Sequence, residues 1–510
     1  MFLIRRALFA ASFLLAGRAL PAWAQASLYI PLDDSRLPLL EHLIARGDIE
    51  DPSPFIRPFR LRDAVRVLSA ADTTPQTAAG SLVRRLRAEF TEDTASARWS
   101  IDMRAGGQAY TQKRRDPLHL GGPGTANWYF DIGLKGVLGP FAVATRPAAE
   151  PSLIGDPDWP NETQEHVTGR LIEGYISGQV RFGSLTYGQL QRNWGPVGLP
   201  GIPLSDYGYQ RQGLALEIGT GAVRLQAIAS DLRSELAEDG DRINRYLFAP
   251  RLEARLARRL RVALWESSIL QGEGRVLETP FANPLSLSFF TNTFGINEEG
   301  NNVMIGADVH WQPHRAVTLQ TQLAIDDFLF NKRYEAPDRY ALTLSASGSV
   351  GRRLAWHATY TQVSSLALRT FNPLENFVDA GVGTGRQFTG MDLVLLRVSL
   401  PAAGTFLVSP EVAFQRQGEG SIDDPFPSRT ADPRTPDGII DVPRLFIGTV
   451  EKTYRIGVGV AGGRGPLELL GNIGYHHVTN SLNQPGGTAD RIVARVQATL
   501  AWRRRGSLGD

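Results

Sequence analysis

The chain has 510 residues, no cysteine, a formal net charge of +2 and a mean hydropathy of −0.17. The absence of cysteine excludes a disulfide, a thiolate metal site, a cysteine nucleophile and an acylated lipoprotein anchor. The nearly balanced charge gives no overall basic excess of the kind that binds nucleic acid. No apolar run of 18 residues follows the N-terminal segment, which excludes a helical membrane protein.

The first 26 residues predict a signal for export. A basic pair, Arg5-Arg6, precedes an apolar stretch over residues 7–17, and two small-x-small sites follow over residues 22–26. This order is typical of a secretory signal peptide, and the apolar stretch is too short to span a bilayer. We expect residues 1–26 to be removed by cleavage between Gln25 and Ser27.

Residues 27–95 predict a small bundle of three amphipathic helices. Asp34-Ser35 and Thr74-Pro75 are plausible helix starts, and Gly47 is a plausible stop. The apolar stripes are Leu37, Leu40, Leu43 and Ile44, then Ala64, Val65 and Leu68, then Leu82, Leu86 and Phe90. These stripes need a partner, which we expect to be each other or the rim of the following domain.

After Arg98 the hydrophobic period changes to two. In the last segment, Ile492, Ala494, Val496, Ala498, Leu500 and Trp502 share one face, opposite Val493, Arg495, Gln497, Thr499 and Ala501. Similar alternation recurs over residues 317–326 and 223–230. One apolar and one mostly polar face per strand is what a lipid-facing wall around a wet lumen requires, although a soluble sandwich would give the same alternation.

The connections between about eighteen candidate strands decide between these folds. Eight short turns alternate with nine longer segments, and both chain ends fall on the short-turn side. Outer-membrane barrels have short periplasmic turns and long external loops, whereas a sandwich has no reason to segregate loop length. Residues 96–510 therefore predict an all-β transmembrane barrel of about 18 antiparallel strands, with residues 27–95 as a periplasmic helical bundle.

Several blocks resemble the Wzi family of outer-membrane capsule-assembly proteins. They are Leu-Tyr-Ile-Pro-Leu-Asp-Asp at 28–34, Gln-Arg-Asn-Trp-Gly-Pro at 191–196, Asn-Asn-Val-Met-Ile-Gly-Ala-Asp at 301–308, Leu-Ala-Ile-Asp-Asp-Phe at 323–328 and Pro-Asp-Arg-Tyr at 337–340. The resemblance covers most of the mature chain in family order. It implies an eighteen-stranded barrel with an N-terminal helical region that binds capsular polysaccharide and holds it at the cell surface. One departure from many outer-membrane barrels is the tail of eight residues after Trp502, so the assembly machinery would have to use Trp502 as an internal signal.

Four residues at expected external strand ends are candidates for polysaccharide binding: Arg192, Asn193, Trp194 and Asp326. Arginine, asparagine and aspartate can hydrogen-bond sugar hydroxyls, and tryptophan can stack on sugar rings. The alternative for the first three is a structural loop clamp with Gly195-Pro196, and for Asp326 an anchor for a loop. We expect all of them, with the aromatic segment 281–290, on one outer rim.

Other motifs give no catalytic, cofactor or metal site. Gly457, Gly459 and Gly462 match a dinucleotide fingerprint by letters, but no helix follows them. His310 and His314 do not share a helical face, and His476 and His477 project to opposite faces of a strand. Asp326 and Asp327 also point oppositely, which disfavours acid–base cooperation.

Three functions remain open from the sequence. The first is a non-enzymatic surface lectin for exported polysaccharide, with outer-membrane lipid and the barrel-assembly machinery as further partners. The second is a passive or substrate-selective porin. The third is a barrel enzyme, which the eight histidines and the lack of a nucleophile motif disfavour.

Overall fold

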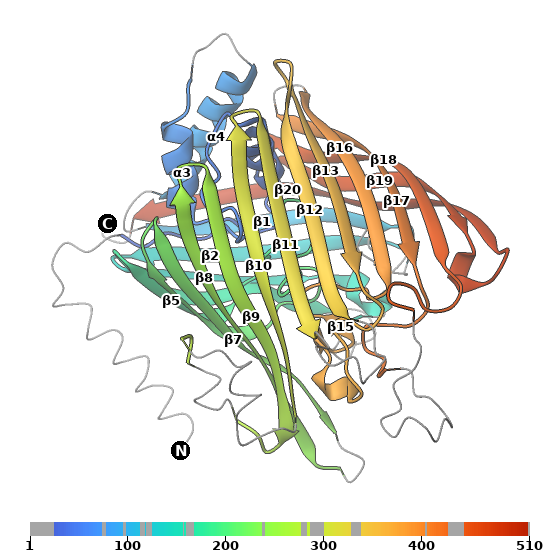
Figure 1. Ribbon diagram of the computed structural model, residues 1–510. Coiled ribbons are helices and arrows are strands. Elements are labelled where there is room, and N and C mark those ends of the chain that lie inside the picture. Colours follow the sequence, from blue (N-terminus) through green and yellow to red (C-terminus); the bar gives the residue numbers. More distant parts are fainter. Residues whose placement is uncertain are drawn as a thin grey trace, which may run out of the picture.

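The computed structural model describes residues 25–73, 78–94, 98–112, 118, 125–156, 158–159, 168–236, 240–276, 283–285, 300–327, 338–402, 405–426 and 443–507. Within these residues, eighteen antiparallel strands form one sheet, and three α-helices precede them (Figure 1). The signal peptide expected over residues 1–26 lies almost wholly outside the described residues, as do most of the loop tips.

The barrel strands follow one another along the chain. They are β1 (Arg98–Tyr110), β2 (Ala126–Leu138), β3 (Phe141–Ala149), β4 (Gly169–Val180), β5 (Gly183–Gln189), β6 (Gln212–Gly219), β7 (Val223–Leu236), β8 (Arg242–Ala257), β9 (Leu260–Glu273), β10 (Asn301–His314), β11 (Val317–Asp327), β12 (Arg339–Val350), β13 (Leu354–Val363), β16 (Met391–Ala402), β17 (Phe406–Gln417), β18 (Glu451–Arg464), β19 (Leu467–Thr479) and β20 (Thr488–Ser507). Within the loops lie the hairpin β14 (Val378–Asp379) with β15 (Val382–Gly383) and the short helices η1 (Pro151–Gly155), η2 (Pro373–Glu375) and η3 (Ser481–Asn483).

The sheet closes on itself. Each barrel strand pairs antiparallel with the next, and β20 returns to pair with β1, from Arg98 opposite Ser507 to Tyr110 opposite Arg495. Closure leaves no unpaired sheet edge, which is what a β-structure in a bilayer requires. The expected barrel class and strand number are confirmed.

Connection length differs between the two ends of the barrel. At one end, the turn end, the eight connections run over two or three residues: 139–140, 181–182, 220–222, 258–259, 315–316, 351–353, 403–405 and 465–466. At the other, the loop end, lie the nine connections 111–125, 150–168, 190–211, 237–241, 274–300, 328–338, 364–390, 418–450 and 480–487. The predicted segregation of connection lengths is confirmed.

The wall is apolar outside and polar inside. Large exposed side chains such as Leu134, Ile176, Ile456 and Ile492 project outward, as the period-two pattern predicts. Many of the alternate positions are polar or charged and buried in the lumen, which means that the lumen contains other parts of the chain. The helices and two loops supply that filling.

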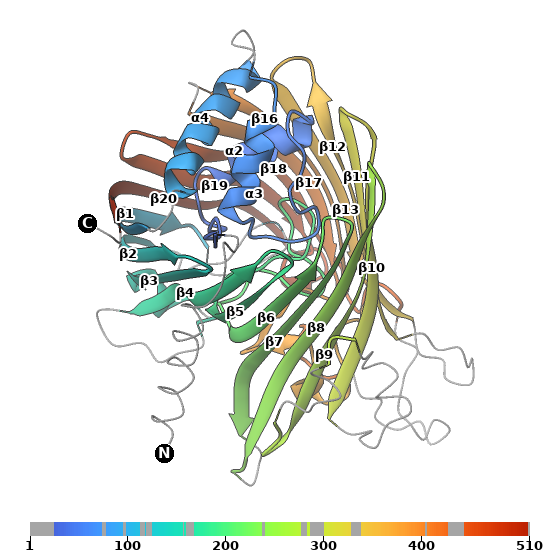
Figure 2. The same ribbon diagram turned by 90° about the vertical axis from the view of Figure 1, so that its left-hand side faces the viewer.

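The helices α2 (Leu37–Arg46), α3 (Leu61–Ser69) and α4 (Ala78–Thr94) lie at the turn end (Figures 1 and 2). Their apolar stripes form one buried cluster together with Leu407 of the wall. Helix α2 ends at Gly47, which has a φ of +75° and lies against the carbonyl oxygen of Arg315, where a side chain would not fit. No described helix is long and apolar enough to cross a bilayer.

The expected division into a bundle and a barrel is only partly descriptive of this arrangement. Helix α2 packs on β11, β12, β13, β17 and β18. The chain segments before and after α2 enter the lumen. There Ser27 exchanges hydrogen bonds with the side chain of Gln179 of β4, and the backbone N–H of Tyr29 donates to the hydroxyl of Tyr175, whose ring it also contacts. The N-terminal region is therefore joined to the barrel by direct contacts with its inner wall.

Candidate functional site

Arg192, Asn193 and Trp194, which were expected on an outer rim, lie inside the barrel. The loop 190–211 turns inward after β5, and its residue Asn193 exchanges two backbone hydrogen bonds with Arg57 of the N-terminal region, at 2.8 and 3.1 Å. The loop 364–390 folds in as well, since Ser205 donates to the carbonyl oxygens of Thr384 and Gly385. The two loops thus brace each other and the N-terminal region.

Trp194 is 1% exposed, so the expectation of a rim position for it is wrong. Its carbonyl oxygen accepts a hydrogen bond of 2.6 Å from Gln322 of β11. The guanidinium of Arg251, which is ion-paired to Asp308, lies over the rings of both Trp194 and Phe55. Because its ring is enclosed by the lumen core, Trp194 has no face available to a sugar in this conformation.

Asn193 and Asp326 hold loops in place. The amide nitrogen of Asn193 donates to the carbonyl oxygen of Leu199 and to Asp206, both at 3.0 Å, and its oxygen accepts from Gly201. Asp326, at the end of β11, accepts a 2.9 Å hydrogen bond from the backbone of Leu368. These contacts match the clamp and anchor alternatives raised from the sequence.

Arg192 differs from its neighbours. It lines two small lumen cavities beside Tyr29 and Glu217, and among the described residues it makes neither a hydrogen bond nor an ion pair. Burial lowers the pKa of its guanidinium, and the oxygens of Tyr29 and Glu217 oppose that shift. Its place is deep in the lumen and not at the rim.

The other residues that the sequence singled out do not form a site with Arg192. Most of the aromatic segment 281–290 lies outside the described residues. His476 is buried against Arg455, whereas His477 is exposed beside Asp490, so the two point to opposite faces of β19 as expected. No group of three potential metal ligands occurs within the described part of the chain.

A cavity of about 330 Å³ lies in the lumen toward the loop end, and we call it the loop-side cavity. It is bounded by β1, β4, β19, β20, η1 and the inward loop 190–211. Its polar and aromatic lining is Asp33, Tyr110, Glu150, Ser152, Asp156, Arg170, Gln191, Asp206, Tyr207, Tyr209, Asn472, Arg495 and Gln497. The volume is at the lower end of the range of ligand pockets, with room for about ten water molecules at ~30 Å³ each.

Tyr209 and the ion pair of Arg170 with Glu150 are held in place by contacts with each other and with their neighbours in the loop-side cavity. The hydroxyl of Tyr209 donates to Asp156, and its ring lies 4.7 Å from that of Trp159 and under the guanidinium of Arg170. Arg170 in turn pairs with Glu150 at 2.7 Å. Pre-ordered aromatic and charged groups of this kind lose little entropy when a ligand binds.

The lining of the cavity also carries polar groups that make no hydrogen bond within the described part of the chain. Arg495 lies over the ring of Tyr110, 5.6 Å from its centroid, and makes no hydrogen bond or ion pair among the described residues. Gln191 and Gln497, which also line the cavity, form no side-chain hydrogen bond within the same described part. Five guanidinium N–H donors and two amides are therefore free to bind a polar ligand.

One cavity carboxyl has an altered acidity. Burial raises the pKa of Asp206, although the hydrogen bond from Asn193 opposes the shift. The carboxyl groups of the lining accept hydrogen bonds, and its guanidinium and amide groups donate them. The cavity therefore offers donors, acceptors and ring faces to a polyol.

The sequence did not predict this cavity, although it indicates where some of the lining residues lie. Arg495 and Gln497 stand on the polar face of the last strand, and Tyr207 and Tyr209 stand in the longer segment before β6. The alternation predicts that the strand residues face the lumen. It does not predict that the loop turns inward to meet them.

Comparison with solved structures finds similar barrels. Wzi of Escherichia coli, described as an outer-membrane protein involved in group 1 capsule assembly and as a carbohydrate-binding β-barrel, aligns with a TM-score of 0.62 and 15% identity over 94% of this chain and 99% of that chain. OprD of Pseudomonas aeruginosa and OccAB4 of Acinetobacter baumannii align at 9% identity, with TM-scores of 0.42 and 0.44, over 80% of this chain and 95% and 98% of theirs. No protein-family model matches the chain, and a sequence comparison with curated proteins finds no match. At these identities the similarity concerns the fold, and the chain has the fold of outer-membrane β-barrels.

Proposed function

We propose that this chain is a non-enzymatic, carbohydrate-binding barrel of the outer membrane, distantly related to the Wzi family, that retains exported capsular polysaccharide at the cell surface. The observation that carries the proposal is the loop-side cavity, in which Tyr110 and Tyr209 stand beside the unbonded Arg495 and Gln497. Wzi, with a similar fold, is described as binding carbohydrate. The helices would then face the periplasm, and the loop end the exterior.

The filled lumen favours binding over passive diffusion. Two inward loops and the N-terminal region are hydrogen-bonded across the interior, and Trp194, Phe55 and Leu393 belong to one core there. A passive porin, the alternative, needs an open channel. A single contact with a sugar is worth on the order of 1 kcal/mol, so a polymer with repeated units would be held by avidity.

The test is a glycan array probed with the purified barrel, followed by calorimetry with the oligosaccharides that bind. We expect the unaltered barrel to bind an oligosaccharide, and we expect the Arg495→Gln variant to bind it with about tenfold lower affinity. A matched control is Arg503→Gln, on the same strand and the same face but at the turn end. No binding to any glycan, with steady weakly selective currents in planar bilayers, would instead support the porin.

A further inference from the structure

A second cavity, of about 390 Å³, lies at the turn end and we call it the turn-side cavity. It is bounded by helix α4 and by β1, β2, β19 and β20, of which β1, β19 and β20 also bound the loop-side cavity. Pro31 and Asp34 line the turn-side cavity, whereas Leu32 and Asp33 line the loop-side cavity. Residues 31–34 are therefore a partition one chain thick, and we call them the septum.

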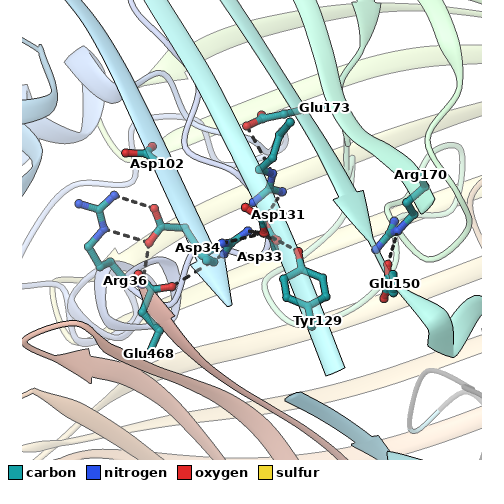
Figure 3. A network of polar contacts seen from close by, with 12 residues as sticks. Asp33, Asp34, Arg36, Asp102, Tyr129, Asp131, Glu150, Arg170, Glu173 and Glu468 are labelled. Atoms are coloured by element: carbon teal, nitrogen blue, oxygen red, sulfur yellow. Dashed lines mark hydrogen bonds and ion pairs between the residues drawn. The ribbon is translucent and has the colours of Figure 1, made fainter. Parts of the chain in front are cut away.

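One side chain joins the septum to the barrel wall. Asp33 accepts hydrogen bonds from Arg146 of β3 at 2.7 Å and from Arg104 of β1 at 3.2 Å. In the described part of the chain, residues 31–34 make no other hydrogen bond to a barrel strand. Asp34, next in sequence, accepts its hydrogen bonds from Arg36 in the same segment (Figure 3).

The two wall arginines have further acidic partners. Arg104 also pairs with Asp131 at 2.8 Å, and the Nε of Arg146 lies 3.7 Å from Glu173. Asp131 of β2 and Glu173 of β4, the strands on either side of β3, are labelled with Asp33 in Figure 3. Release of Asp33 would therefore leave neither guanidinium as a lone buried charge, which avoids the main cost of breaking a buried ion pair.

Asp33 lies away from the strands on which helix α2 packs. Helix α2 packs on β11, β12, β13, β17 and β18, whereas Asp33 is bonded to β1 and β3. Leu32, next to Asp33, packs against the buried core of the helices. A shift of Asp33 away from β1 and β3 therefore does not require the contacts of α2 with the barrel wall to break.

We propose that the two cavities are halves of one polar conduit through the barrel, that the septum is its gate, and that Asp33 is the latch that keeps it shut. The charged lining suits small polar or ionic solutes. Opening withdraws one negative charge and exposes the faces of Arg104 and Arg146, so the open conduit favours anions. The conduit includes the loop-side cavity that we also propose as the carbohydrate site, but its opening does not require a carbohydrate to bind.

The experiment measures the conductance of the purified full-length protein in planar bilayers. Asp33→Asn keeps the size of the side chain but removes the charge that pairs with both arginines. We expect no steady current from the unaltered protein and steady currents with an anion-favouring reversal potential from Asp33→Asn. Asp34→Asn is the matched control, because it alters the neighbouring carboxylate, and it should stay closed.

A second variant guards against an effect on folding alone. Arg146→Gln leaves Asp33 bonded to Arg104, so its open fraction should lie between those of the unaltered protein and Asp33→Asn. All variants are first compared for heat-modifiable migration as folded barrels. Folded Asp33→Asn protein as silent as the unaltered protein would overturn the proposal, and so would equal currents from Asp34→Asn.

Discussion

The two halves of the lumen have walls of the same strand pattern but different fillings. Along β12, β13 and β16 many lumen-facing positions are small or apolar, such as Thr343, Thr361 and Leu393, and the inward loops and α2 cover them. Along β1, β2, β19 and β20 many are charged or amide side chains, such as Arg104, Asp131 and Arg495, and cavities remain. A period-two strand specifies which residues face inward, and the chemistry of those residues specifies whether the interior is packed or wet.

The largest expected effect is on the stability of the half of the lumen along β12, β13 and β16, which we call the packed half. Trp194→Ala removes a fully buried ring from between Arg251 and the lumen core, and loss of such a side chain typically costs about 3–5 kcal/mol. We expect loop 190–211 to become sensitive to protease while the strands stay folded. Trp311→Ala, which removes an exposed ring from the outer wall, is the control and should leave the loop protected. Equal protease sensitivity of both variants would show that the lumen core does not hold the loop.

Acid should weaken the packing of α2. Burial, with help from Arg46, lowers the pKa of His42 from 6.5 to about 4, and its Nδ1 lies 2.7 Å from the Ser399 hydroxyl. Because the docked form binds the proton less readily than the undocked form, its stability is complete above pH 6.5 and falls between pH 6.5 and 4. The loss is on the order of 1–3 kcal/mol. Hydrogen exchange of residues 37–46 at pH 7 and 4.5 measures it.

His42→Gln separates this titration from other effects of acid. Glutamine can bond Ser399 but does not titrate near neutral pH, so exchange over α2 should become independent of pH in this range. An unchanged pH dependence in the variant would assign the effect to another group.

We call the half of the lumen that contains the two cavities the wet half. A substitution there should change ligand binding and not stability. Arg495→Gln removes a half-buried cation that stacks on Tyr110 but makes no hydrogen bond or ion pair within the described part of the chain, so the free energy of unfolding should change little. Oligosaccharide affinity should fall about tenfold, as expected for the loss of one charge-assisted contact. A stability loss as large as that of Trp194→Ala would mean that the wet half is also held by packing.

The smallest expected effect is that of mild acid on the septum. Although burial alone would raise it, Arg146 and Arg104 hold the pKa of Asp33 well below its usual range. A lowered folded pKa means that the stabilisation is complete above the ordinary value near 3.8 and is lost only as the pH falls through the lowered value. Bilayer conductance of the unaltered protein should therefore not rise between pH 7 and 4.5, and a rise would contradict Asp33 as the latch.

Much of the fold follows from local patterns. The alternation of residues 492–502 and the segregation of connection lengths predict the wall, because period and turn chemistry are properties of short segments. The apolar stripes and Gly47 likewise predict α2. The inward course of loop 190–211 could not be predicted, since it depends on contacts of Asn193 with Arg57 and of Trp194 with Gln322, far apart in sequence.

The candidate site follows the same division. Arg192, Asn193, Trp194 and Asp326 were found because they form recognisable polar–aromatic groups at strand ends, yet three of them make structural contacts. The residues of the loop-side cavity come from segments spread from Tyr110 to Gln497 and from the N-terminal Asp33. Only the closed barrel brings them together, so no single sequence motif could predict this site.

Hydrogen–deuterium exchange with and without a bound oligosaccharide tests the central claim most directly. If the wet half binds the sugar, protection should appear at residues 206–211 and 494–498, with none at the turn-side residues 463–468. Protection confined to the turn end, or to the outer loops away from Tyr209 and Arg495, would contradict the assignment of the loop-side cavity as the ligand site.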